Sequence, residues 1–217
     1  MNQDTEEFLK DLEQGEDVFG IILFGSWARG NNRPESDVDL VVILKDGYRR
    51  TVEYKNKQAF EIIYTTAESA LAFWKSHTDD CFSLWEVAKI LYDKDGTIAK
   101  LQQEAKNIIK EGKKPIDPYQ VGQFKFSAED ELTAVESLIE KDSATANLVL
   151  QKTVLSLTGL FFDLRQLWTP APKQRLKMIQ ELKPDLYVLL RDFYSSKQTL
   201  SAKLNIARSI VPLVFEK

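Results

Sequence analysis

The stretch GSWARGNNRPESDVDL, residues 25–40, decides the fold of this chain. It places a Gly-Ser pair ten residues before an Asp-Val-Asp triplet, and an apolar run follows the triplet. The residues just before it, 17–24, are mostly β-branched, aromatic or otherwise apolar. Short apolar runs bounded by glycines and turn residues predict buried strands. We therefore predict strands at 17–24 and 37–44, with the polar residues of the stretch at the mouth of a β-sheet.

Asp37 and Asp39 lie two residues apart at the start of the second strand. Side chains alternate faces along a strand, so both carboxylates point to one face and Val38 points to the other. Two carboxylates this close repel each other unless cations lie between them, and carboxylate oxygens are ligands suited to Mg²⁺. We therefore predict that Asp37 and Asp39 bind magnesium.

Gly25, Ser26 and Arg29 have the chemistry of a phosphate site. A glycine lets the backbone approach a phosphate, and the Ser26 hydroxyl can donate to it together with the free N–H groups of the next turn. Ser26 is also predicted to cap a short helix that runs to about Arg29, whose guanidinium adds positive charge. The stretch thus combines a phosphate cradle with a pair of metal ligands.

Glu61 interrupts an apolar segment, AFEIIY, that predicts a strand at 59–65. We expect this strand to form a hairpin with one at 51–55, through a turn near residues 56–57, and to neighbour the strand of the aspartates. An unpaired carboxylate is costly to bury, so Glu61 should face a cation or solvent. It could bind metal, act as a base, or simply face water on an edge strand.

These residues resemble the signature of the DNA polymerase beta-like nucleotidyltransferase superfamily, which is Gly-Ser, ten residues, Asp-x-Asp and a third acid on a later strand. The forms GSWARG and SDVDL, with ILYDKDG before a helix, are most similar to the bacterial minimal nucleotidyltransferases and aminoglycoside adenylyltransferases. The resemblance covers residues 17–111. It implies that AMP passes from ATP to an acceptor hydroxyl, with two Mg²⁺ ions held by Asp37, Asp39 and Glu61.

The other elements predict an α+β fold in two domains. Residues 1–112 would form a mixed sheet with an edge strand at 88–92 and flanking helices at 5–13, 67–76, 79–86 and 97–110. EGKKPIDP, residues 111–118, contains two prolines and a glycine that break regular structure, and only helical patterns follow it. Helices are expected at 127–140, 144–168, 173–182, 185–195 and 198–211, with breaks at Pro184 and Pro212. Residues 113–217 should therefore be an all-α bundle, which by resemblance would bind the acceptor.

Composition limits where the chain works and what it binds. A net charge of −4 argues against an extended nucleic-acid surface, and no apolar run is long enough to cross a membrane. The acidic amino terminus lacks the features of a signal peptide, and one cysteine, Cys81, excludes an internal disulfide, so we expect a cytoplasmic protein. Residues 1–112 carry 14 Lys/Arg and 21 Asp/Glu, whereas residues 113–217 carry 15 and 12. An acidic half and a basic half would suit a site that holds cations and a polyphosphate between them. Two solvated surfaces without a functional role explain the charge asymmetry equally well.

Three further side chains are open candidates. Lys173, just after the TPAP break, could reach the triphosphate from the second domain, although a solvated basic helix face is the simpler explanation. Asp163 could bind a cationic substrate, but a basic neighbour on its own helix or plain exposure would also account for it. Trp27 could stack on the base or pack in the core. His77 is the only histidine, so a zinc site is excluded.

The leading hypothesis is an enzyme whose partners are a nucleotide and a small-molecule acceptor similar to an aminoglycoside. One alternative is a protein-modifying nucleotidyltransferase of the antitoxin type. Another is an inactive nucleotide-binding module, which the presence of all three acids disfavours. The three hypotheses differ only in the acceptor and in whether turnover occurs.

Overall fold

The structure is a computed structural model that describes residues 3–77, 79, 87–195 and 197–216. The helix predicted at 79–86 therefore lies outside the described residues, apart from Asp79. By its contacts the chain divides into two units, Met1–Glu111 and Gly112–Lys217.

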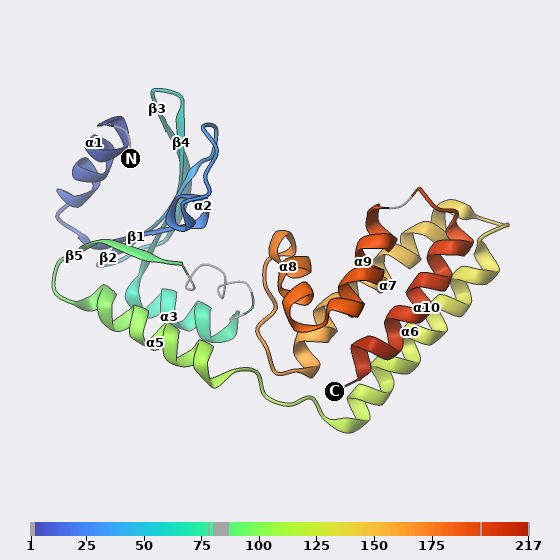
Figure 1. Cartoon of the computed structure of the whole chain (residues 1–217). Helices are drawn as coiled ribbons and strands as arrows, with labels where there is room; N and C mark the ends of the chain where they lie inside the picture. The colour runs from blue at the N-terminus through green and yellow to red at the C-terminus, as the bar shows by residue number, and fades with distance from the viewer. Residues whose placement is uncertain (1–2, 78, 80–86, 196, 217) are drawn as a thin grey trace. The chain divides into compact units, whose positions relative to one another are not determined.

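A five-stranded mixed sheet in the order β3-β4-β2-β1-β5 organises the described part of the first unit (Figure 1). The strands are β1 (Val18–Phe24), β2 (Val38–Leu44), β3 (Arg49–Lys55), β4 (Gln58–Thr66) and β5 (Lys89–Asp93). β2 and β4 run parallel, and every other neighbouring pair is antiparallel. The predicted mixed sheet is confirmed, with β3 starting two residues earlier than expected.

Helices cover both faces of this sheet, as the apolar runs of β1 and β2 require (Figure 1). On one face, α1 (Gln3–Glu13) and α2 (Gly25–Arg29) enclose a core with the side chains of Leu23, Leu40 and Phe60. On the other face, α3 (Ala67–Ser76) and α5 (Thr97–Glu111) pack on alternate residues of the same strands. The alternation therefore places neighbouring residues of each strand in two different cores.

The β3–β4 hairpin has the two-residue turn that the sequence predicts. Asn56 and Lys57 both have positive φ, 48° and 73°. This conformation suits a tight hairpin, because its twist matches that of the flanking strands. The turn fixes the pairing of β3 with β4, so that Val52 lies opposite Glu61.

The regular elements described in the second unit are all helices, as predicted. Its helices are α6 (Pro118–Leu138), α7 (Ser143–Leu164), α8 (Pro172–Leu182), α9 (Pro184–Ser195) and α10 (Leu200–Phe215). They share one core, in which Phe161, Phe162 and Phe193 are fully buried. Figure 1 shows α6, α7 and α10 running side by side, in agreement with their packing contacts. Among the described helices, none combines the length and the hydropathy that a membrane span requires.

Two helix boundaries differ from the predictions because of local capping. The helix predicted to begin at residue 127 begins at Pro118, which initiates it rather than breaking it. Proline fits the first helical position, where no N–H is needed, and the Asp117 carboxylate accepts from the Tyr119 N–H (2.8 Å). The helix predicted to reach residue 168 ends at Leu164, because Gln166 adopts a left-handed conformation (φ 57°).

Pro212 does not end the last helix, although its position predicted a break there. α10 continues through Pro212 to Phe215. The buried side chains of Val211 and Val214 lie on either side of the proline and pack in the helical core. Their burial offsets the hydrogen bond that the proline removes.

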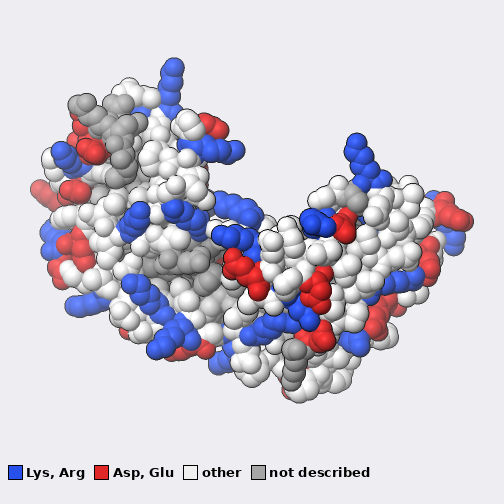
Figure 2. Space-filling model, in the orientation of Figure 1, with Lys and Arg blue, Asp and Glu red and all other residues white. Residues whose placement is uncertain are grey.

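Charged side chains are dispersed over the face shown in Figure 2. Lysine and arginine side chains there are interspersed with acidic and neutral ones rather than gathered into one basic field.

Candidate active site

Three carboxylates meet at one end of the sheet. Asp37 immediately precedes β2, Asp39 is its second residue, and Glu61 lies on β4. Asp39 and Glu61 are direct partners in the parallel pairing of the two strands. One oxygen from each carboxylate lies within 4.8 Å of the other two. The sequence predicted this meeting from the side-chain alternation and from the expected neighbourhood of the two strands.

The burial of these acids suits a site that is reached from solvent. Asp37 is exposed, whereas Asp39 and Glu61 are half-buried. Val38, between the two aspartates, is fully buried on the opposite face of the sheet. The strand is therefore anchored by its apolar residue while the carboxylates stay accessible. Three negative charges at this spacing favour a cation, because a cation lowers their mutual repulsion.

Arg50 on β3 forms an ion pair with Glu61. Its Nε donates to Glu61 Oε1 (2.8 Å), and its Nη2 bonds the same oxygen. The hydrogen bond and the charge of Glu61 raise the pKa of Arg50 above its usual value. The sequence patterns did not predict a role for Arg50. The hairpin turn at residues 56–57 could have indicated this contact. Counting back along both strands from the turn pairs Val52 with Glu61, so Arg50 lies diagonally across from Glu61 on the same face.

Gly25 joins the two halves of the deciding stretch. It follows β1 and begins α2 with φ of 67°, in the left-handed region that favours glycine. A side chain at this position would collide with the Asp39 carboxylate. Contrary to the prediction, Ser26 does not cap α2. The cap position is held by Phe24, whose side chain makes no cap hydrogen bond, because the helix begins at Gly25, one residue earlier than expected.

Ser36 anchors the loop that leads to Asp37. Its carbonyl oxygen accepts from the Trp27 Nε1–H (3.2 Å) and from the Gln58 side-chain amide (2.8 Å). The Trp27 ring also packs against the core on the α1 side of the sheet. Trp27 therefore packs on the core, and its stacking on a nucleotide base stays a prediction. The two donors fix the residue that immediately precedes the first aspartate.

Comparison with known proteins agrees with this geometry. The model of the nucleotidyltransferase domain family matches residues 4–127, from α1 to the middle of α6. The chain belongs to this nucleotidyltransferase family. The predicted superfamily resemblance is confirmed, and the chain is a transferase by family.

One curated relative and one solved structure add detail. A protein of Methanocaldococcus jannaschii, named as a candidate protein adenylyltransferase, is 46% identical over 55 residues. The match covers 24% of this chain and only 37% of that relative. A crystal structure of a nucleotidyltransferase-like protein from Exiguobacterium sibiricum superposes with a TM-score of 0.52 and 15% identity, covering 98% of this chain and 73% of the other. At this identity the likeness concerns the fold alone.

The other predicted residues of this nucleotidyltransferase lie as follows. Arg29 is half-buried in the last turn of α2. Lys173 belongs to the second unit, where its side chain is exposed in the first turn of α8, and its role at the triphosphate remains a prediction. Asp163 forms an ion pair with Lys113, which also donates to Thr169 (3.0 Å). The partner of Asp163 therefore comes from the segment before α6. The alternative of a basic neighbour on the same helix is wrong.

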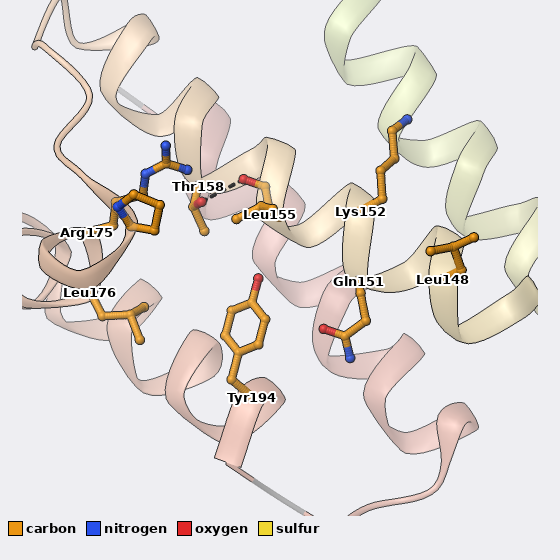
Figure 3. A pocket seen from close by; sticks show the side chains of 9 residues that line it. Leu148, Gln151, Lys152, Leu155, Thr158, Arg175, Leu176 and Tyr194 are labelled. Carbon is orange, nitrogen blue, oxygen red and sulfur yellow. Dashed lines mark hydrogen bonds between the residues drawn. The ribbon is translucent and has the colours of Figure 1, made fainter. Parts of the chain in front are cut away.

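Pockets in the helical unit show what this part of the nucleotidyltransferase could bind. Figure 3 shows a pocket of about 370 Å³, in which Tyr194 of α9 points its hydroxyl toward α7. Apolar side chains of α7 and α8 form most of its wall, and Lys152 and Arg175 are its charged lining residues. A second pocket of about 460 Å³ contains the carboxylates of Glu131 and Asp163, but Lys152 and Lys113 already pair with them.

Proposed function

We propose that this chain transfers AMP from ATP to an acceptor hydroxyl and releases pyrophosphate. The observation that carries the proposal is the convergence of Asp37, Asp39 and Glu61 at the end of β2 and β4, beside a glycine turn. The family match supports nucleotidyl transfer in general. ATP as donor, and the individual role of each residue, belong to the proposal.

The donor set fits Mg²⁺. It consists of three carboxylates, each with an oxygen within 4.8 Å of the others, and hard oxygen ligands of this kind suit magnesium. Asp37 and Asp39 would hold two such ions, and Glu61 would hold one of them or accept the proton of the acceptor hydroxyl. Bound Mg²⁺ would supply Lewis-acid stabilisation of the charge that develops on the phosphates.

The α2 turn would hold the leaving phosphates. Gly25 keeps the backbone free of a side chain where the chain passes Asp39. The Ser26 hydroxyl and backbone N–H groups would donate to phosphate oxygens, and the Arg29 guanidinium would offset their charge. These residues orient the α-phosphorus for in-line attack, and positioning of this kind accounts for a large share of catalysis in phosphoryl transfer.

A protein hydroxyl is the acceptor we favour over an aminoglycoside. The curated relative is named as a candidate protein adenylyltransferase. An aminoglycoside is a polycation and needs acids that are free to bind it. In the two pockets described above, the acids Glu131 and Asp163 are paired with lysines, and the pocket around Tyr194 contains Lys152 and Arg175. The helical unit, residues 113–217, would bind the acceptor.

Pyrophosphate release tests the proposal. The purified chain is incubated with Mg²⁺, each NTP in turn, and cell-derived proteins or aminoglycosides, and modified proteins are detected by the added mass of AMP. We expect release with ATP and loss of at least about 100-fold in the Asp37→Asn and Asp39→Asn variants. Asp46→Asn is the matched control, because Asp46 follows the opposite end of β2 and is exposed.

The outcomes separate the hypotheses. Modification of a protein supports the favoured acceptor, and modification of an aminoglycoside supports the small-molecule alternative. Full activity in Asp39→Asn contradicts the metal-ligand assignment. Binding of MgATP without release of pyrophosphate from ATP in the presence of any acceptor would favour an inactive nucleotide-binding module.

A further inference from the structure

The Arg50–Glu61 ion pair occupies part of the proposed metal site. Both contacting nitrogens of Arg50 bond Oε1 of Glu61, and Glu61 is one of the three acids that lie within reach of one cation. The Arg50 side chain is 62% exposed, whereas that of Glu61 is 24% exposed. The acid is therefore held by the sheet, while the guanidinium reaches it from the solvent side on a long, flexible side chain.

The position of Arg50 on the hairpin explains its orientation. Arg50 and Val52 lie two residues apart on β3, so their side chains project from the same face, and Val52 pairs directly with Glu61. Arg49, the preceding residue, projects from the opposite face, where its guanidinium lies 3.9 Å from the centre of the Tyr64 ring. Two adjacent arginines on one strand thus have separate environments, and only Arg50 is directed at the acids.

The three clustered carboxylates are stabilised by a positive charge at Glu61, which either Arg50 or a metal ion can supply. Three carboxylates repel one another, and Arg50 supplies one positive charge that offsets part of this repulsion. A divalent cation that uses Glu61 as a ligand must compete with the guanidinium for the negative charge of this carboxylate. The Arg50 side chain is largely exposed, so solvent weakens the ion pair and its displacement is feasible.

We propose that Arg50 is an internal counterion of the acidic site, which holds Glu61 in the metal-free protein and is displaced from it when a divalent cation binds. This inference rests on the proposed function for the identity of the metal site. It assigns Arg50 a role in setting metal affinity and in positioning Glu61. A variant without the guanidinium should therefore bind the metal more tightly, because the competing cation is gone. A variant that merely damages the structure would bind it more weakly.

Titration with Mn²⁺ alone tests the inference. Binding to the nucleotide-free full chain is measured by the loss of the free-ion electron paramagnetic resonance signal, for the unmodified protein, Arg50→Gln, Arg50→Lys and Arg49→Gln. We expect Arg50→Gln to bind Mn²⁺ roughly three- to tenfold more tightly than the unmodified protein. Arg50→Lys keeps the positive charge but loses the planar guanidinium, so its Mn²⁺ affinity should lie between those of the unmodified protein and Arg50→Gln. Arg49→Gln removes the same charge from the same strand and should change affinity much less.

The outcomes distinguish this inference from the proposed function. Equal Mn²⁺ affinity in Arg50→Gln and the unmodified protein, or an equal gain in Arg49→Gln, would overturn the counterion role while leaving metal-dependent transfer intact. Weaker binding in Arg50→Gln would also overturn it and would make Arg50 a support of the site instead. If Asp39→Asn binds Mn²⁺ as well as the unmodified protein, the metal site itself is wrong and both proposals fail.

Discussion

A β-carbon placed on Gly25 would lie 1.8 Å from Oδ2 of Asp39, well inside contact distance. The two residues are 14 positions apart, and each belongs to a different half of the stretch that decides the fold. The missing side chain of Gly25 therefore makes room for the Asp39 carboxylate, in addition to letting the backbone approach a phosphate.

Replacement of Gly25 by alanine should therefore damage the metal site. The backbone there is left-handed, and the added methyl group would displace the Asp39 carboxylate. We expect a loss of about 1–3 kcal/mol in the free energy of unfolding from strain. We also expect pyrophosphate release to fall at least about 100-fold, because small displacements of positioned groups are costly. Urea denaturation and the release assay measure the two effects.

Gly30→Ala is the control for this prediction. Gly30 also has a positive φ, 73°, but an added β-carbon there would have no neighbour within 4 Å. This variant should show the backbone strain with little loss of activity. Similar loss of activity in both variants would show that strain alone, and not the collision with Asp39, disables the site.

Lys173 gives a second prediction, which tests its expected contact with the triphosphate. If Lys173 binds the phosphates, Lys173→Ala should raise the KM for MgATP roughly threefold or more and leave the fold unchanged. Lys177→Ala is the matched control, because Lys177 is also exposed on α8. If both variants keep the KM of the unmodified protein, the basic side chains of α8 are a solvated surface.

Glu131 gives a third prediction, which concerns stability and pH. Burial acts to raise the pKa of Glu131, but hydrogen bonds from Lys152 and Thr153 outweigh it and lower the pKa below the usual value. A lowered pKa in the folded state means that the contribution is fully present above the unfolded pKa of about 4.3. It is lost as the pH falls through the folded value.

Urea denaturation at pH 7 and pH 3 measures how the contribution of Glu131 to the free energy of unfolding changes with pH. Glu131→Gln should be less stable than the unmodified chain by about 0.5–1 kcal/mol at pH 7, and the difference should shrink at pH 3. Glu129→Gln, on an exposed position of the same helix, should follow the unmodified chain at both values. A difference as large at pH 3 as at pH 7 would mean that packing, rather than charge, is lost.

The acidic site was largely predictable because its main features are local. Alternation along a strand requires Asp37 and Asp39 to share a face, and the apolar run after them requires burial. The turn at residues 56–57 was also visible as a two-residue polar break between β-forming segments. The helix starts and stops were less predictable. Asp117 and Pro118 start α6 where the composition suggested only a break.

The sequence by itself determined the strands of the first unit, the helices of the second, and the pair of aspartates at the start of a strand. These follow from periodicity and spacing, which any short segment carries within itself. Only the tertiary structure decided that Asp39 lies directly opposite Glu61, that Arg50 holds Glu61, and that Gly25 makes room for Asp39. Such contacts depend on strand order and register, which are fixed by packing on both faces of the whole sheet.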